Sequence, residues 1–202
     1  MESSRERLMI AILDLIREVG YKNASTKKIA ERVQMNEASI FRLFGSKKEL
    51  FMEAVYAESI SGEIVDIAMI RALPSLKTRI EVLLASCMKF GFKQATIFRA
   101  VMTYSDMFTD SERSHNLLDR VTELIEVMSS FFQDEFNNGT MRAFNFHMFS
   151  EIIFSRILTA SIEFTEKETD QKIIEPQTKR FIRLYADFIY DNFKTEKDCD
   201  FD

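Results

Sequence analysis

Hydrophobic and polar positions alternate with the period of an α-helix through nearly the whole chain. Apolar residues recur three or four positions apart in successive segments, and nearly every Gly and Pro falls between two such segments. The 202 residues include only 5 Gly and 2 Pro, which is too few for the many turns of a β-sheet protein. The pattern therefore predicts an all-α protein of about nine helices.

The N-terminal part of the chain contains four short predicted helices. The first begins at Ser3, where Glu6 completes a possible capping box, and it ends at Gly20. The next three begin at residues that favour a helix N-cap, namely Ser25, Asn36 and Ser46. A turn of two or three residues separates the second helix from the third, and their apolar positions can share one core with the first. This arrangement predicts a helix-turn-helix, a motif whose second helix can enter the major groove of DNA.

Longer and more apolar helices are predicted after Pro74. Four of them span residues 76–92, 95–107, 112–136 and 143–166. The last of these four is apolar almost all round, which a helix requires only where it is buried on several sides. A final helix follows Pro176, and its apolar stripe also requires a partner surface. These segments predict a helical bundle larger than the N-terminal module.

Charge is distributed unevenly along the chain. Residues 1–50 carry 10 Lys and Arg against 7 Asp and Glu, whereas the remaining residues carry 17 against 25. The net charge of the whole chain is −5. The positive balance of the N-terminal part suggests that this part meets an anion and that the C-terminal part does not.

Cysteine usage and hydropathy narrow the class of protein. Cys87 and Cys199 are far apart in sequence, so they suggest neither a disulfide framework nor a metal site, and we expect no cofactor. The N-terminus lacks the basic start and apolar stretch of a secretory signal. The longest run without charge, residues 143–150, is far too short to span a membrane. We therefore expect a soluble, cytoplasmic protein that has no membrane partner.

Three stretches match a known signature in order and in register: Gly20-Tyr21-x-x-x-Ser25-Thr26-x-x-Ile29-Ala30, Ser39-Ile40-Phe41-x-x-Phe44 and Ser46-Lys47-Lys48-Glu49-Leu50. Over residues 6–56 the chain resembles the N-terminal part of the TetR family of bacterial transcriptional regulators. The resemblance implies a helix-turn-helix DNA-binding domain at residues 1–52 and a helical ligand-binding and dimerisation domain at residues 53–202. It further implies a homodimeric repressor that a small hydrophobic molecule releases from a palindromic operator in double-stranded DNA.

Two lysine pairs lie where an isolated helix would disfavour them. Lys27–Lys28 and Lys47–Lys48 each follow a predicted N-cap, and the start of a helix carries partial positive charge. A DNA phosphate would remove this conflict, because it accepts hydrogen bonds from the lysines and from the unpaired backbone N–H groups. The alternative is that the lysines are solvated charges balanced in part by Glu31 and Glu49. The candidates for phosphate contacts are Ser25, Thr26, Lys27, Lys28, Lys47 and Lys48.

The third predicted helix, residues 36–44, is the expected recognition helix. Its core-facing positions are Ile40 and Phe44. The positions left to face DNA are Glu37, Ala38, Ser39 and Arg42. Arg42 could hold a guanine or a phosphate, Ala38 could touch a thymine methyl, and Glu37 could accept from cytosine N4. Glu37 could equally serve only as a partner of the helix dipole.

Three residues depart from the pattern of the family. Phe41 also belongs to the DNA-binding set, but it stands where a tyrosine is usual, so the hydroxyl–phosphate bond is absent. Leu43 replaces a usual histidine donor, and Gln34 replaces the turn glycine. Either Gln34 adopts a left-handed conformation at some cost or the turn differs. Together these departures predict a weaker grip on the DNA backbone than is usual in the family.

The larger domain is rich in Phe and Met, and the resemblance implies a ligand pocket in it. Six residues are candidates for the lining: Phe98, Met102, Tyr104, Phe108, Phe131 and His147. Such side chains at helical spacing also suit an ordinary core. Two apolar helices from each of two chains could form a four-helix dimer interface about a two-fold axis. The candidates for this interface are Phe154, Phe181, Leu184, Tyr185 and Phe188.

Two other classes of protein compete with a regulator. A di-iron enzyme would need two Glu-x-x-His motifs, and Glu112-Arg-Ser-His115 is one. The other histidine, His147, has Phe144 where a glutamate is required, so we expect no enzyme. A helical small-molecule carrier or signalling adaptor that has lost DNA binding is the second alternative, which the missing tyrosine and histidine donors keep open.

Overall fold

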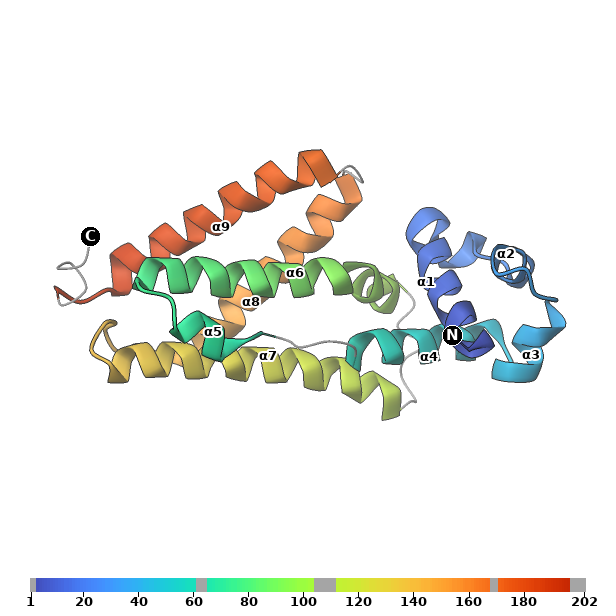
Figure 1. Ribbon diagram of the computed structural model, residues 1–202, viewed down its shortest axis with the longest axis horizontal. Coiled ribbons are helices and arrows are strands. Elements are labelled where there is room, and N and C mark those ends of the chain that lie inside the picture. The colour runs from blue at the N-terminus through green and yellow to red at the C-terminus, as the bar shows by residue number, and fades with distance from the viewer. Residues whose placement is uncertain (1–2, 61–64, 104–111, 168–170, 197–202) are drawn as a thin grey trace. The chain divides into compact units, whose positions relative to one another are not determined.

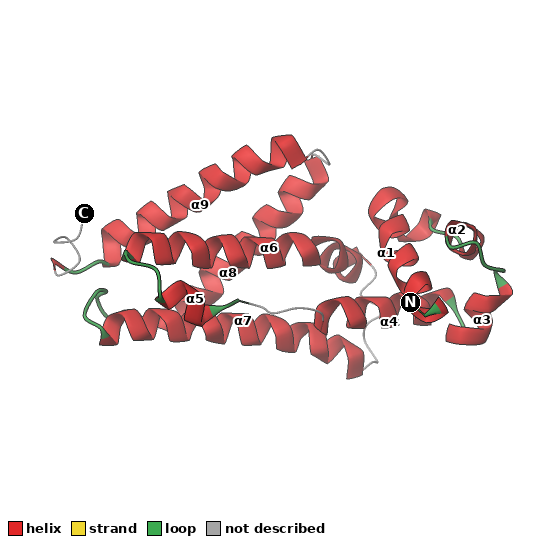
Figure 2. Cartoon of the chain, viewed as in Figure 1, coloured by secondary structure: helices red, strands yellow, loops and turns green. Residues whose placement is uncertain are grey.

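The computed structural model consists of α-helices joined by loops (Figures 1 and 2). It describes residues 3–60, 65–103, 112–167 and 171–196. Within these ranges there is no β-strand, only an isolated bridge between Met141 and Lys194. The predicted all-α fold is confirmed. The helices are α1 (Ser4–Asn23), α2 (Thr26–Arg32), α3 (Ala38–Phe44), α4 (Lys47–Ile60), α5 (Ile67–Arg71), α6 (Leu76–Thr103), α7 (Glu112–Asn137), α8 (Phe146–Lys167) and α9 (Gln171–Phe193).

Contacts between residues divide the chain into two compact units. The first comprises residues 1–61 and 96–120, and the second comprises residues 62–95 and 121–202. Each unit has its own hydrophobic core. None of the helices in the described ranges is long and apolar enough to cross a membrane.

The first unit is organised around α1, which packs against α2 and α4, while α3 packs against α4. The side chains at its centre are fully buried: Leu8, Ile12, Ile29, Ile40 and Phe51. The predicted capping box of α1 is present, because Ser3 Oγ accepts from the Glu6 N–H and the Glu6 carboxylate accepts from the Ser3 N–H. The regular helix is interrupted at Gly20, where it was predicted to end: Gly20 has non-helical angles, φ 77° and ψ 161°, and a short helical segment follows this kink to Asn23.

The second unit consists of α5, the first part of α6, most of α7, and α8 and α9. α6 and α7 run antiparallel, and α8 and α9 cross them obliquely (Figure 1). The core between them is mainly aliphatic and aromatic, with Leu83, Met128, Phe131 and Ile157 fully buried. α6 and α8 approach closely at Gly91, where a Cβ atom would lie only 2.4 Å from Ser161 Oγ.

Three differences from the prediction lie in the chain after α4. The predicted break between residues 92 and 95 is wrong, because α6 continues from Leu76 to Thr103 with Gln94 and Ala95 buried inside it. α9 begins at Gln171, so Pro176 lies inside the helix near its start rather than before it. Helix α5 was not predicted, because its five residues are too few for a periodic pattern.

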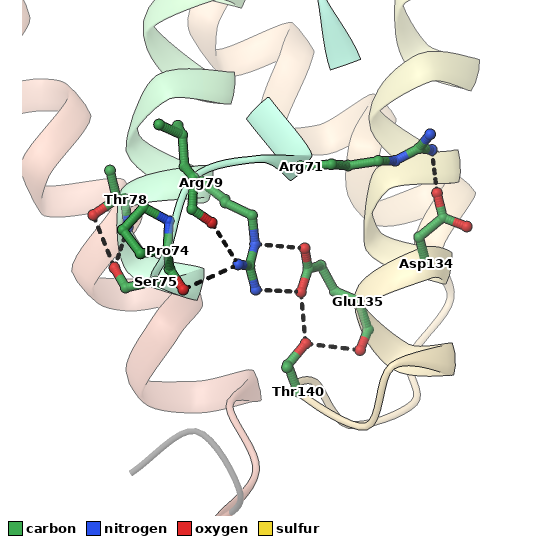
Figure 3. A network of polar contacts seen from close by, with 9 residues as sticks. Arg71, Pro74, Ser75, Thr78, Arg79, Asp134, Glu135 and Thr140 are labelled. Atoms are coloured by element: carbon green, nitrogen blue, oxygen red, sulfur yellow. Dashed lines mark hydrogen bonds and ion pairs between the residues drawn. The ribbon is translucent and has the colours of Figure 1, made fainter. Parts of the chain in front are cut away.

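A buried ion pair joins α6 to α7 in the second unit (Figure 3). Arg79 Nε lies 2.8 Å from Glu135 Oε1, and Arg79 Nη2 donates to Glu135 Oε2 at 2.9 Å. Arg79 Nη1 also donates to the Leu73 carbonyl, and Thr140 Oγ1 donates to Glu135 Oε2. The pair therefore connects the loop before α6, the end of α7 and the loop after α7.

Candidate nucleic-acid interface

The turn between α2 and α3 is closed by a left-handed residue. Gln34 has a φ of 56°, and in the described part of the chain no other non-glycine residue has a positive φ. The Gln34 N–H donates to the Glu31 carbonyl, and the Met35 N–H donates to the Ala30 carbonyl. This pair of bonds is a Schellman motif with Gln34 at the position that glycine favours. Of the two conformations expected for this turn, the structure has the left-handed one.

Replacing Gln34 by glycine is expected to raise the free energy of unfolding by about 1 kcal/mol, because glycine adopts a positive φ without steric cost. Urea unfolding followed by circular dichroism measures this change. Gln34→Ala is the matched control and should leave stability nearly unchanged, since alanine meets the same steric conflict as glutamine. A glycine variant that is less stable than the alanine variant would contradict the strained conformation.

Serine residues cap the two helices that flank the recognition helix. Ser25 Oγ accepts from the Lys28 N–H at 3.3 Å, and Ser46 Oγ accepts from the Glu49 N–H at 3.1 Å. Both predicted helix starts are therefore confirmed. The first turns of α2 and α4 have N–H groups that the helices themselves do not use, and such groups can bind a phosphate.

Three of the four candidate lysines are exposed to solvent: Lys27, Lys28 and Lys48. Lys28 Nζ has one long hydrogen bond, 3.4 Å to the Asn23 carbonyl. Lys27 and Lys48 have no hydrogen bond or ion pair with any residue that the structure describes. Among the described residues no carboxylate pairs with these three ammonium groups, and this exposure is compatible both with phosphate contacts and with the alternative of solvated surface charges.

Lys47 differs from the other three lysines, because its side chain turns inward. Its Nζ donates to the Tyr21 carbonyl and lies 4.1 Å from the centre of the Tyr21 ring. Burial lowers the pKa of Lys47. The Tyr21 ring in turn contacts Phe51 of α4, with 5.1 Å between the ring centres. Lys47 therefore joins the end of α1 to the start of α4.

The recognition helix α3 presents a distinct outer face. Ile40 and Phe44 are buried, as predicted, whereas Ala38, Phe41 and Arg42 are exposed. Phe41 is 52% exposed, which is unusual for a large apolar side chain. The remaining two candidates on this face, Glu37 and Ser39, are half-buried. The side chain of Arg42 forms no hydrogen bond or ion pair with any described residue, so its guanidinium can bind a ligand from solvent.

Thr26 and Glu37 contact each other directly. Thr26 Oγ1, in the first turn of α2, donates to Glu37 Oε1 at 2.5 Å. Both residues belong to the predicted DNA-binding set, but no local pattern in the sequence indicated that they would pair. The bond links α2 to the residue that precedes α3.

Two arginines of α1 support the helix-turn-helix and were not predicted. Arg7 donates to the Val33 carbonyl at the end of α2, and Arg5 donates to the Leu43 carbonyl near the end of α3. Arg5 also pairs with Glu53 of α4 and lies 4.4 Å from the centre of the Phe44 ring. These cations satisfy carbonyl groups at two helix C-termini, where positive charge is favourable.

Of the six residues predicted to line a ligand pocket, the structure describes the side chains of three, namely Phe98, Phe131 and His147. Phe98 packs against the core of the first unit, and Phe131 is fully buried in the core of the second. His147 is exposed at the start of α8, 3.7 Å from Glu151. Tyr104 and Phe108 lie outside the described residues, as does the side-chain environment of Met102. A groove of about 720 Å³ in the second unit involves none of them; it is lined by Glu81, Lys179, Arg180, Ile182, Arg183, Leu184 and Asp187.

The five dimer-interface candidates fall into two groups. Phe154 and Phe181 are buried within the core of their own chain, where Phe154 contacts Phe90. Leu184 and Phe188 are 64% and 51% exposed, and Tyr185 is half-buried between them. Within a single chain, therefore, the surface that remains for a partner on α9 is formed by Leu184, Tyr185 and Phe188. On α8, Met148 and Ile152 are exposed in the same way.

Part of the chain matches known protein sequences. The family model described as "Bacterial regulatory proteins, tetR family" matches residues 8–54. An uncharacterized HTH-type transcriptional regulator of Bacillus subtilis (strain 168), YvkB, is 36% identical over 61 residues, which is 30% of this chain and 32% of the relative. The sequence match thus spans about a third of that relative's length.

Solved structures share the fold along nearly the whole chain. A candidate transcriptional regulator from Saccharomonospora viridis, in complex with choline, has a TM-score of 0.70 at 16% identity and covers 96% of this chain and 98% of its own. A TetR transcriptional regulator from Agrobacterium tumefaciens has a TM-score of 0.66 at 14% identity, with coverages of 98% and 97%. The ketosteroid transcriptional regulator KstR2 of Mycobacterium tuberculosis has a TM-score of 0.61 at 12% identity, and 97% of each chain is covered.

The predicted resemblance to the family is confirmed for the N-terminal helices. The family model covers α1 to α4, which hold the capped helices and the exposed face of α3. The structural likeness extends to the second unit. Residues 8–54 of this chain therefore match the tetR family of bacterial regulatory proteins, and the chain as a whole shares its fold with solved structures of regulators.

Proposed function

We propose that this regulator binds double-stranded DNA with α3 in the major groove and with α2 and α4 gripping the phosphates on either side. The observation that carries the proposal is the outer face of α3, where Phe41 and Arg42 are exposed beside two capped helix starts with outward lysines. A surface that combines cations with unpaired backbone N–H groups suits a polyanion. A carrier or adaptor would have no need for such a surface.

A homodimer would present two such surfaces to one DNA duplex. Exposed apolar residues on α8 and α9 support dimerisation, because Ile152, Leu184 and Phe188 are each more than half exposed in the single chain. A two-fold axis through this surface would repeat α3 in a second copy. Recognition helices separated by about 34–36 Å would then meet successive major grooves of a palindromic operator.

A small hydrophobic molecule is the proposed effector, and repression by operator occupancy is the proposed mode of control. One structural relative contains choline and another is named a ketosteroid regulator, so proteins of this fold accept organic ligands of different polarity. Such a ligand would act by binding more tightly to one of two conformations of the protein. The change in DNA affinity cannot exceed the difference between the ligand's affinities for these two conformations. A coupling of about 1–3 kcal/mol would alter the affinity 5- to 150-fold.

Selection of bound fragments from a pool of duplexes with a randomised centre tests this function. The full chain should enrich a palindromic sequence whose half-sites lie about one helical turn apart. The selection is then repeated in the presence of steroids, of fatty acids or of choline. The compound class that contains the effector should abolish the enrichment of the palindromic sequence. If no duplex is enriched at low salt, the carrier or adaptor becomes the better description.

Phe41→Tyr is expected to tighten DNA binding by about fivefold at every sequence, because the added hydroxyl can donate to a phosphate. The exposed ring leaves room for the hydroxyl without repacking, since Phe41 is 52% exposed. Fluorescence anisotropy with a selected duplex measures the affinity. Phe41→Leu is the control for the ring itself. Equal affinities of the tyrosine and phenylalanine proteins would show that this position lies away from the backbone.

A further inference from the structure

We infer that Glu37 selects cytosine at one position of each DNA half-site and that Thr26 is the positioning residue that orients its carboxylate. The inference rests on the proposed function, because it requires α3 to lie in the major groove. It goes further by naming the base that the site prefers and the side chain that enforces the preference.

The carboxylate of Glu37 is held in one place before any DNA binds. Thr26 Oγ1 donates to Glu37 Oε1 at 2.5 Å, across the turn that joins α2 to α3. Both side chains are half-buried, so the bond is shielded in part from competing water. The second carboxylate oxygen, Oε2, has no hydrogen bond within the described part of the chain. One oxygen is thus anchored, and the other remains able to accept.

The local structure does not use Glu37 as a helix cap. Glu37 occupies the N-cap position of α3 but has a right-handed helical conformation and makes no side-chain bond to the helix. The Ala38 N–H is instead satisfied by Asn36 Oδ1, at 2.9 Å. Glu37 therefore makes no cap hydrogen bond, although its negative charge still suits the start of a helix, as in the alternative of a helix-dipole partner.

The chemistry of DNA leaves few partners for a fixed carboxylate. An ionised carboxylate only accepts hydrogen bonds, and phosphates repel it. In the major groove the donors are cytosine N4 and adenine N6, and adenine N6 lies beside the N7 acceptor, which would face the same carboxylate. Cytosine is therefore the base that best compensates the half-buried charge. At guanine or thymine the carboxylate would lose water without gaining a donor, and at adenine it would also face the N7 acceptor, which is a basis for specificity by exclusion.

The pairing also assigns a role to Thr26. Its hydroxyl proton is directed to Glu37, so Thr26 acts on DNA through Glu37 rather than by donating that proton to a phosphate. Thr26→Ser keeps the donor and Thr26→Val removes it at similar volume. The two variants separate the orienting hydrogen bond from simple packing of the side chain.

The test is duplex selection followed by affinity measurements on the full chain. Wild type, Glu37→Gln, Thr26→Val and Thr26→Ser are each selected against the same randomised pool, and anisotropy then compares the four bases at the implicated position. Glu31→Gln is the matched control, because it removes the same charge from an exposed residue of α2 that has no side-chain hydrogen bond in the described residues. Circular dichroism confirms that each variant is folded.

Wild type should enrich cytosine at one symmetric position of each half-site. Glu37→Gln should reduce the preference for cytosine about tenfold and favour adenine, because an amide can both donate and accept. Thr26→Val should weaken the same preference several-fold, Thr26→Ser should restore it, and Glu31→Gln should leave it unchanged. The inference is overturned if Glu37→Gln enriches the same bases as wild type or changes the affinity for all duplexes equally. If the wild type enriches no duplex, the proposed function itself fails.

Discussion

Replacing Lys27, Lys28 and Lys48 together by alanine is expected to lower the affinity for a selected duplex on the order of a thousandfold at moderate salt. These three lysines are exposed at the starts of α2 and α4 and have no carboxylate partner among the described residues. For each phosphate contact that is lost, one fewer counterion is released when the protein binds DNA. The dependence of affinity on salt should therefore also become shallower. Anisotropy titrations at several salt concentrations measure both quantities.

The matched control for this variant is alanine at Lys89, Lys93 and Lys179. These lysines are also exposed, but they lie on α6 and α9. Both triple variants change the net charge equally, so a general electrostatic effect would appear in both. The proposed interface would be contradicted if the two variants bound the duplex with the same affinity. Stability of the two proteins should be similar, since surface charges contribute little to folding.

Glu135→Ala is expected to lower the free energy of unfolding by about 3–5 kcal/mol. The substitution leaves the Arg79 guanidinium in a largely buried site without its counter-charge, because the side chains of Arg79 and Glu135 are only 13% and 4% exposed. It also removes one of the two acceptors of Thr140 Oγ1, while the Glu135 carbonyl remains as the other (Figure 3). Urea unfolding followed by circular dichroism measures the change.

A neighbouring ion pair supplies the control for this second prediction. Arg71 pairs with Asp134, directly before Glu135 in α7, but these side chains are 47% and 38% exposed. Asp134→Ala should therefore cost less than about 1 kcal/mol. The double variant Arg79→Leu with Glu135→Leu should be more stable than Glu135→Ala alone, since it leaves no unpaired charge. Equal losses for Asp134→Ala and Glu135→Ala would show that burial of the pair contributes nothing.

Much of the helix-turn-helix could be predicted from the sequence because its signals are local. N-cap serines at Ser3, Ser25 and Ser46 act on groups within one turn, and the structure confirms all three starts. The burial of Ile40 and Phe44 follows from helical periodicity in the same way. The sequence identified Gln34 as the residue that replaces the usual turn glycine, but it was compatible with two conformations of the turn. Neither the left-handed conformation nor its hydrogen bonds could therefore be predicted.

Contacts between distant residues could not be predicted. Lys47 looks like its neighbour Lys48 in the sequence, and only the approach of Tyr21 turns its ammonium group inward. Arg5 and Arg7 are ordinary charged residues of an amphipathic helix until α2 and α3 place two carbonyl groups beside them. The bond between Thr26 and Glu37 likewise depends on the angle between α2 and α3.

The continuous α6 illustrates the same limit in the second unit. A polar pair, Lys93 and Gln94, interrupts the apolar pattern and suggests a break, but Gln94 is 1% exposed and remains helical. The helix continues because the segment contains no proline and because Ala95 is also fully buried. Tertiary packing therefore overrides the local pattern in this segment.

The dependence of wild-type DNA affinity on salt tests the central claim most directly. The logarithm of the association constant for a selected duplex, measured by anisotropy, should fall linearly with the logarithm of the salt concentration. A dimer that neutralises six to ten phosphates should give a slope of about −5 to −9. An absence of binding in dilute buffer, or an affinity that does not change with salt, would contradict an interface formed by the lysines of α2 and α4 around α3.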